Sequence, residues 1–324
     1  MSLDYRNRIV AGFVFFLTVL TMNLLAEGSA MEIKDKDRTT VESSISAEGC
    51  TIEEFEVFSK SMERGIKVVV ILPPEYKDNP GKKYPILYTL HGYAAPFDTF
   101  SKMSPLREAL KDKPMIVTCL DGDKGSWYLD STYTQKDYSN EENKKGAPAR
   151  PPVKSLFTTF FFDEFVPFVD KYYRVNPSQR MVTGFSMGGF GAFHYMLTKP
   201  KMFASVSALS GSLVSLVDDG GLRKWLVPVL GNFSQHRDRY EETDMYNRVK
   251  KCVANKEKLP PVFLHSGTED GALPGSEKMA KFLQSNGFDC KFEKSPGKHD
   301  WAFWKGASAG IIDFHWKTLK EHGK

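Results

Sequence analysis

The residues best suited to chemistry in this chain lie in the pentapeptide GFSMG at positions 184–188. A short apolar run, residues 180–185, predicts a buried strand before Ser186, and a helical pattern continues from there to Pro200. A serine at such a sharp turn has a strained backbone that exposes its hydroxyl, and a side chain at either glycine would collide across the turn. We therefore predict that Ser186 is a nucleophile and that the amide of Met187, at the helix N-terminus, stabilises an oxyanion.

Chemistry at Ser186 also needs a base and an acid. A serine hydroxyl is a poor nucleophile until a neutral imidazole takes its proton, and a carboxylate must fix the tautomer of that imidazole. Around turns of this kind the order along the chain is serine, acid, histidine. His299 follows the last expected strand in a glycine-containing loop, which favours it as the base. Asp270 follows the preceding expected strand and is the predicted acid, with Glu269 and Asp300 as alternatives.

The other histidines after the serine have less suitable positions. His194 lies on the helix that follows the serine and points away from the turn, whereas His265 lies inside an expected strand. His315 belongs to the C-terminal helix and His322 to the tail. The acids at 163–164 lie on a helix far from the turn, where we expect solvated or ion-paired carboxylates.

A second oxyanion donor is expected from a loop before the serine. Residues 84–90, YPILYTL, predict a strand buried on both faces, and His91-Gly92 follows it directly. The loop after such a strand is the usual source of this donor, which here is the amide of Tyr93. For the His91 side chain itself we expect a loop-capping role without a part in the chemistry.

Two tryptophans are candidates for substrate contacts. Trp127 lies just beyond the end of a central strand, where open α/β sheets place their ligands, although aromatic residues there often serve packing alone. Trp301 follows His299 in the same loop. Residues 121–155 and 212–258 are long irregular segments, and long irregular segments in compact domains are usually functional. We expect both segments to shape the pocket.

The elements that position these residues alternate between strands and helices in the second half of the chain. Expected strands cover residues 50–59, 65–72, 84–90, 115–120, 180–185, 203–209, 261–267 and 288–294. Expected helices cover residues 97–111, 156–173 and 276–287, with further helices ending at Pro200 and beginning near Trp301. The first two strands suit an antiparallel hairpin at one edge. The pattern predicts an α/β fold with a mostly parallel central sheet and helices on both faces.

Composition narrows the class of protein. The chain has 324 residues, of which 41% are hydrophobic, enough for one large domain with a real core. The net charge of +4 comes from 44 basic and 40 acidic residues spread along the chain, so nucleic acid is not an expected partner. Of the four cysteines, Cys119 is expected to be a buried free thiol, while Cys252 and Cys290 could pair in one of three possible connectivities. No spacing suggests a metal site, and the chemistry requires no cofactor.

The N-terminus indicates export. Arg6 and Arg8 precede an apolar run over residues 9–25, and small residues then offer cleavage after Ala26 or Ala30. We expect a signal peptide at residues 1–30 and a secreted or periplasmic protein, with a retained anchor or a cytoplasmic start at residue 31 as alternatives. Residues 31–48 are predicted to be a flexible leader, and residues 49–324 the catalytic domain.

These motifs carry a family resemblance. GFSMGGFGA, the His91-Gly92 loop, HSGTED and GKHDWAFW together resemble the esterase D-like group of α/β hydrolases over about residues 50–320. That group includes tributyrin esterases, S-formylglutathione hydrolases, feruloyl and acetylxylan esterases, and the mycolyltransferase antigens. The resemblance implies an α/β-hydrolase fold. WYLDS at 127–131 is more similar to the small-ester and carbohydrate-ester branches than to the formylglutathione branch.

The sequence therefore predicts a serine carboxylesterase that forms an acyl-enzyme. Its expected substrates are acetyl or feruloyl esters of polysaccharide, or short-chain esters, with no stable membrane association after signal cleavage. Two alternatives stay open: an acyltransferase with the same Ser-His-Asp site and a sugar hydroxyl as acceptor, and a non-catalytic carbohydrate-binding protein. The oligomeric state is not predicted.

Overall fold

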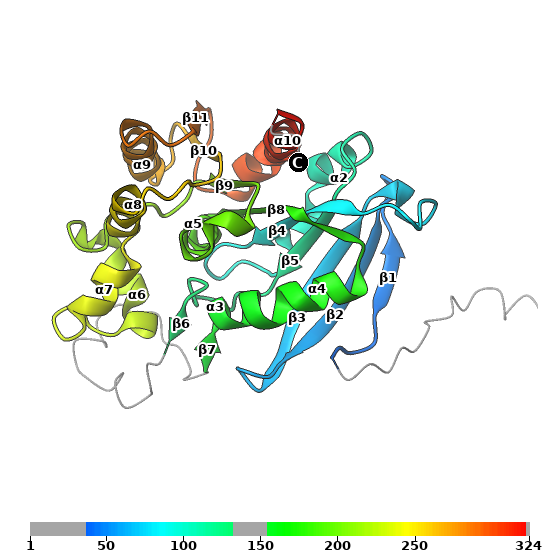
Figure 1. Ribbon diagram of the computed structural model, residues 1–324, viewed down its shortest axis with the longest axis horizontal. Helices are drawn as coiled ribbons and strands as arrows, with labels where there is room; N and C mark the ends of the chain where they lie inside the picture. The colour runs from blue at the N-terminus through cyan, green and yellow to red at the C-terminus, as the bar shows by residue number, and fades with distance from the viewer. Residues whose placement is uncertain (1–36, 132–153, 322–324) are drawn as a thin grey trace, which may run out of the picture.

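The computed structural model describes residues 37–131 and 154–321, so the expected signal peptide and part of the 121–155 segment lie outside the described residues. Its central feature is a nine-stranded sheet in the order β1-β2-β3-β5-β4-β8-β9-β10-β11 (Figure 1). The bounds are β1 (Glu42–Ile45), β2 (Thr51–Ser59), β3 (Arg64–Leu72), β4 (Tyr84–Leu90), β5 (Ile116–Leu120), β8 (Val175–Phe185), β9 (Ser205–Leu209), β10 (Val262–Gly267) and β11 (Cys290–Ser295). Strands β1, β2, β3 and β5 pair antiparallel, and every pair from β5 to β11 is parallel. A second, two-stranded sheet joins β6 (Asp130–Ser131) to β7 (Ser155–Leu156).

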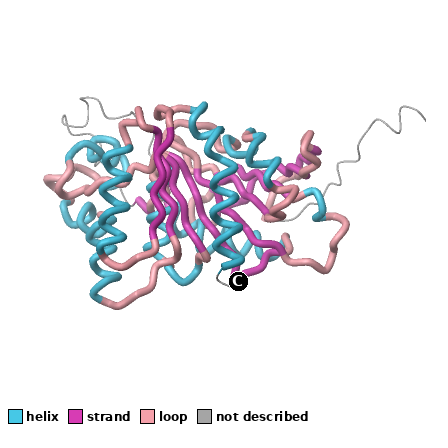
Figure 2. Tube along the Cα trace, turned by 90° about the horizontal axis from the view of Figure 1, so that it is seen from above, coloured by secondary structure: helices cyan, strands magenta, loops and turns pink. Residues whose placement is uncertain are grey.

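Helices cover both faces of the large sheet, as Figure 2 shows from above. One face carries α2 (Ser104–Ala109) and α10 (Trp301–Glu321). The other carries α4 (Val166–Tyr172), α5 (Met187–Thr198), α8 (Met245–Ala254) and α9 (Leu273–Ser285). The other helical pieces of the described residues are α3 (Phe157–Thr159), α6 (Arg223–Leu230), α7 (Arg237–Thr243), a π-helical stretch at Phe160–Phe165, and 3-10 turns at Pro74–Tyr76, Thr99–Lys102, Pro200–Met202 and Gly220–Leu222. The predicted α/β architecture is confirmed.

Among the described residues, no helix has the length and apolar character needed to cross a membrane.

Strand β4 shows why the sheet needs two helical layers. All seven of its residues are buried, and successive side chains point to opposite faces. Ile86 and Tyr88 join the core beneath α4 and α5, whereas Leu87 joins the core beneath α2 and α10. A strand that is apolar on both faces must be covered on both, so the sequence of β4 requires this layering.

The structure corrects the expected leader. Residues 42–45 form β1, which pairs with β2, and Glu48 forms an ion pair with Arg107 at 2.7 Å. All four side chains of β1 are exposed, and 61% of the surface of Ile45 is accessible to solvent. Backbone pairing holds this strand, so the low apolar content that suggested a leader was a poor guide. Residues 31–36 lie outside the described part.

Two other expectations also change. The helix expected at 97–111 is divided, because Met103 has an extended backbone and α2 begins after it with Pro105 in its first turn, where a missing amide is tolerated. All four cysteines are buried free thiols, so the possible pairing of Cys252 with Cys290 is not formed. The expected free thiol at Cys119 is present.

Candidate active site

The turn between β8 and α5 has the strained geometry that its sequence predicts. Ser186 has φ 54° and ψ −117°, a conformation that a non-glycine residue rarely adopts. A Cβ at Gly188 would overlap the carbonyl oxygen of Leu90, and a Cβ at Gly184 would overlap the backbone of Gly188. Both glycines are therefore required for α5 to begin this close to the sheet, with Ser186 at the tip of the turn.

Ser186, His299 and Asp270 form one hydrogen-bonded chain. The Ser186 hydroxyl donates to Nε2 of His299, and Nδ1–H of His299 donates to Oδ1 of Asp270, each over 2.9 Å. The carboxylate is fully buried, whereas the imidazole is 40% exposed, so the ring can meet a substrate while its partner is shielded from water. The three residues follow β8, β11 and β10, whose carboxyl ends meet at one edge of the sheet.

The two alternative acids have other roles. Glu269 lies near Lys298 at 3.8 Å and has a side chain that is 64% exposed. Asp300 accepts a hydrogen bond from the Phe303 amide in the first turn of α10. Neither contact leads to the imidazole of His299, so the structure places only Asp270, of the three, in the chain of hydrogen bonds.

The environment of Asp270 keeps it ionised. Burial raises the pKa of this carboxyl, but the hydrogen bond from His299 and the nearby Ser210 side chain lower it, and the net pKa lies below the ordinary value. The Ser210 hydroxyl in turn accepts a hydrogen bond from Nε1–H of Trp304 at 3.0 Å. The ring of Trp304 packs edge-on against the imidazole of His299, with centroids 5.0 Å apart. Trp304 therefore contacts the imidazole of His299 and holds the hydroxyl of Ser210.

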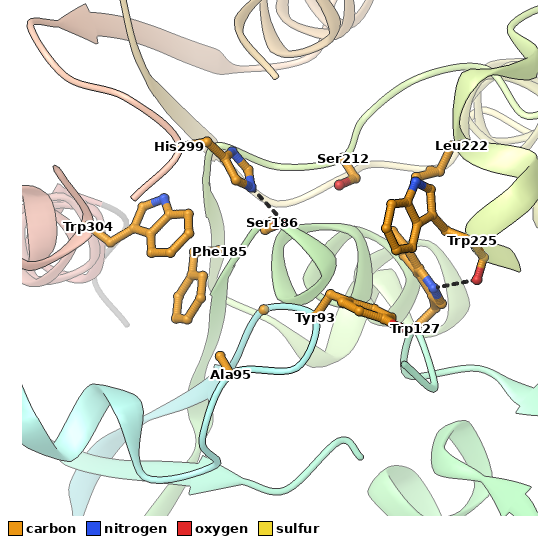
Figure 3. Close-up of a pocket in the computed structure, with 11 residues that line it drawn as sticks. Tyr93, Ala95, Trp127, Phe185, Ser186, Ser212, Leu222, Trp225, His299 and Trp304 are labelled. Atoms are coloured by element: carbon orange, nitrogen blue, oxygen red, sulfur yellow. Dashed lines mark hydrogen bonds between the residues drawn. The ribbon is translucent and has the colours of Figure 1, made fainter. Parts of the chain in front are cut away.

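A cavity of about 370 Å³ opens beside the Ser186 hydroxyl. Figure 3 shows two groups of apolar side chains on either side of this serine. One group comprises Ala95, Phe185 and Trp304; the other comprises Tyr93, Trp127, Leu222 and Trp225; Gly92, Ser212 and His299 complete the lining. The cavity can therefore hold a small or flat apolar group on each side of Ser186.

The two expected oxyanion donors border this region. Met187 is the first residue of α5, and the first amides of a helix have no intrahelical acceptor. Tyr93 lines the cavity beside Ser186, and its ring packs against Trp225 with centroids 5.1 Å apart. Their roles as donors stay a prediction.

Of the two tryptophans expected to contact substrate, only Trp127 lines the cavity. Trp127 lines the cavity, but it is only 3% exposed, has φ 56°, and donates its indole N–H to the carbonyl of Trp225 at 3.1 Å. It therefore contributes to both packing and the cavity wall. Trp301 is 40% exposed and does not line the cavity. Trp304, one helical turn later, occupies the position expected for Trp301, because α10 begins at Trp301 and turns its side chain away.

Sequence reasoning missed several lining residues. Trp304 could have been considered, since it lies one helical turn after Trp301 and is its neighbour on the helix surface. Trp225 and Leu222 gave no usable signal, because they lie in the irregular 212–258 segment and reach the cavity only through the packing of α6 and of the 3-10 turn before it. Phe185 was seen only as part of the turn.

The remaining polar candidates lie outside the cavity. Partly buried His194 contacts Arg248 at 2.7 Å, and desolvation lowers its pKa. Burial also lowers the pKa of His315 to about 3, and its ring nitrogens contact Ser205 and Ser207. Of the acids at 163–164, the glutamate accepts hydrogen bonds from two backbone amides at positions 60 and 61. These groups connect neighbouring elements, and Glu164 does so through backbone amides rather than as the solvated or ion-paired acid expected.

Comparison with known families agrees with this geometry. Residues 59–312 match the model of the Esterase family, described as "Putative esterase". The chain belongs to this family. The match confirms the resemblance seen in the sequence motifs and spans the strands and helices that carry the three residues around Ser186.

Individual relatives are more distant. The chain is 25% identical over 283 residues to an acetyl esterase of Caldicellulosiruptor saccharolyticus, covering 81% of this chain and 97% of that protein. The S-formylglutathione hydrolase of Agrobacterium tumefaciens has a similar fold, with a TM-score of 0.69 at 17% identity over 86% of this chain and 99% of that chain. A ferulic acid esterase gives a TM-score of 0.64 at 22% identity over 83% and 98%. These solved structures confirm the α/β-hydrolase fold.

Replacing Gly188 with alanine tests the close approach at the turn. The added Cβ meets the Leu90 carbonyl, which cannot move without disturbing β4, so Gly188→Ala is expected to lose activity and at least about 2 kcal/mol of unfolding free energy. Gly310→Ala is the control, because its Cβ would meet no atom within 4 Å on an exposed turn of α10; it should gain about 0.5–1 kcal/mol. Urea unfolding and ester hydrolysis measure both. An active, stable Gly188→Ala protein would contradict the geometry.

Replacing Asp270 with asparagine tests the electrostatics. The pKa of Asp270 lies below its ordinary value, so the carboxylate is charged at neutral pH and can hold the imidazole of His299 through their hydrogen bond of 2.9 Å. Asp270→Asn is expected to lower kcat by about 10⁴-fold at neutral pH. Glu269→Gln, which removes the adjacent exposed acid, should leave kcat and its pH dependence unchanged. Pre-steady-state and steady-state rates from pH 5 to 9 measure the effect, and equal losses in both variants would argue against Asp270 as the acid.

Proposed function

We propose that this protein hydrolyses carboxylic esters through an acyl-enzyme on Ser186. Membership of the Esterase family makes it a carboxylesterase, and the single observation that supports the mechanism is the continuous chain from Ser186 through His299 to Asp270. Without that chain the hydroxyl of Ser186 would be a weak nucleophile.

The reaction follows from the positions of the protons. Oγ of Ser186 attacks the ester carbonyl carbon while its proton passes to Nε2 of His299, and the amides of Met187 and Tyr93 stabilise the oxygen that becomes negative. His299 then returns the proton to the departing alcohol. Water attacks the acyl-enzyme with His299 again as base, and the acid leaves. Asp270 stays ionised and holds the imidazole in place throughout.

The cavity supports acetyl, feruloyl or other short esters as substrates. Its walls on both sides of Ser186 are apolar, and Tyr93, Trp127 and Trp225 present aromatic rings on one side (Figure 3). A flat hydroxycinnamoyl group or a small acyl group suits such a space, whereas a long acyl chain exceeds about 370 Å³. The similarity to an acetyl esterase and, in fold, to a ferulic acid esterase agrees with this range. In a polysaccharide substrate, the ester would enter the cavity while the sugar chain stays at its solvent-facing mouth.

Substrate assays test this proposal. The chain without residues 1–30 and its Ser186→Ala variant are compared on p-nitrophenyl acetate, methyl ferulate and acetylated xylan. We expect hydrolysis by the wild type and a loss of up to about 10⁶-fold in the variant. The preferred ester then identifies the substrate class.

Two outcomes would favour the alternatives. A dominant transfer product at modest concentrations of an acceptor alcohol would indicate an acyltransferase. A wild type that neither hydrolyses any ester nor reacts with a fluorophosphonate probe at Ser186 would indicate a binding protein on a hydrolase scaffold.

We also propose that the protein is exported. The support is the N-terminal pattern of two arginines, an apolar run and small residues over 1–30. N-terminal sequencing of the mature protein from fractionated cells is expected to give a start just after Ala26 or Ala30, outside the cytoplasm. Recovery of the intact N-terminus in the cytoplasm would contradict export, and recovery in the membrane would indicate a retained anchor.

A further inference from the structure

The side chain of His91 has a defined tautomer. It lies just after β4, is 1% exposed, and both ring nitrogens have backbone partners. The amide of Gly122 donates to Nε2 over 2.9 Å, so Nε2 carries no proton. The ring proton of the neutral imidazole is therefore on Nδ1, which donates to the carbonyl oxygen of Gly92 over 2.8 Å.

That carbonyl belongs to the same peptide unit as a predicted oxyanion donor. The C=O of Gly92 and the N–H of Tyr93 share one planar trans peptide, in which they point in opposite directions. The carbonyl also accepts a hydrogen bond from the Ala95 amide at 3.1 Å. Fixing the Gly92 oxygen from two sides fixes the direction of the Tyr93 N–H.

The loop around this peptide is docked onto a second loop. The hydroxyl of buried Tyr128 donates to the His91 carbonyl at 3.0 Å, and the Ala94 amide donates to the Lys124 carbonyl at 2.9 Å. A Cβ at Gly125 would meet the ring of Tyr93, so the two loops touch closely there. His91 also connects the two loops, because its Nε2 accepts from Gly122 in the second loop and its Nδ1 donates to Gly92 in its own loop.

We propose that His91 is a positioning residue for the oxyanion hole: through Nδ1–H it orients the Gly92–Tyr93 peptide so that the Tyr93 amide faces the oxyanion formed on Ser186. This replaces the expectation that the His91 side chain has no part in the chemistry, and it rests on the proposed function. His91 contacts no substrate atom in this role.

Two substitutions separate the two nitrogens. In His91→Asn the side-chain amide NH2 occupies the place of Nδ1 and keeps the donor to the Gly92 carbonyl, but it does not reach Gly122. In His91→Gln the side-chain oxygen reaches the place of Nε2 and keeps the acceptor for Gly122, but the donor to Gly92 is lost. We expect His91→Gln to lower kcat by about 10- to 100-fold with little change in KM, a part of what removal of an oxyanion donor costs. His91→Asn should keep most of kcat.

Binding of a trifluoromethyl ketone distinguishes positioning from loss of stability. Its adduct with Ser186 places an oxyanion in the hole, so His91→Gln should weaken its inhibition constant by about the same factor as kcat/KM. His315→Gln is the control, since His315 is also fully buried with both nitrogens in contact with hydroxyls. It should lower the melting temperature without changing kcat or inhibition, measured well below that temperature.

The outcomes are separable. A His91→Gln protein with wild-type kcat and wild-type inhibition would overturn the role of His91. Equal loss of kcat in the Asn and Gln variants would overturn it too, because the donor to the Gly92 carbonyl would then not matter. A wild type that neither hydrolyses esters nor binds the ketone would instead count against the proposed function.

Discussion

The close approach of Gly188 to the end of β4 is the constraint on which the site depends. A Cβ at this position would overlap the Leu90 carbonyl oxygen, so only glycine lets the first turn of α5 lie against the strand. Since Ser186 precedes that turn and His91 follows Leu90, the same contact brings the Ser186 hydroxyl next to the predicted oxyanion loop. The strained φ of Ser186 is maintained because the surrounding backbone leaves no other position for the turn.

Parallel strands supply the remaining chemistry. Asp270 and His299 follow β10 and β11, so their loops leave the sheet at the same edge as the turn at Ser186. The carboxylate is buried and the imidazole half-exposed, which keeps the charge shielded while the base remains accessible. Trp304 supports this arrangement from α10, because its indole N–H binds Ser210 and its ring packs on His299. The sheet sets the distances between Ser186, Asp270 and His299, and the terminal helix sets the orientation of the His299 ring.

Several side chains that line the cavity come from other segments than Ser186, Asp270 and His299. Trp225 and Leu222 come from the segment between β9 and β10, and Trp127 comes from the loop after β5. These side chains hold one another, since the indole of Trp127 donates to the Trp225 carbonyl and Tyr93 packs on the Trp225 ring. Changes in these loops can alter the acyl preference while the three residues around Ser186 stay in place.

The sequence by itself determined the turn at Ser186, the order of Asp270 and His299 after it, and the layered α/β fold. Each depends on local requirements: glycines that avoid a clash, and apolar runs that need cover on both faces. Only the tertiary structure decided that β1 pairs with β2, that Trp304 rather than Trp301 lines the cavity, that Trp225 reaches it, and that both nitrogens of His91 connect two loops. These features depend on contacts between segments far apart in the chain, which no local pattern records.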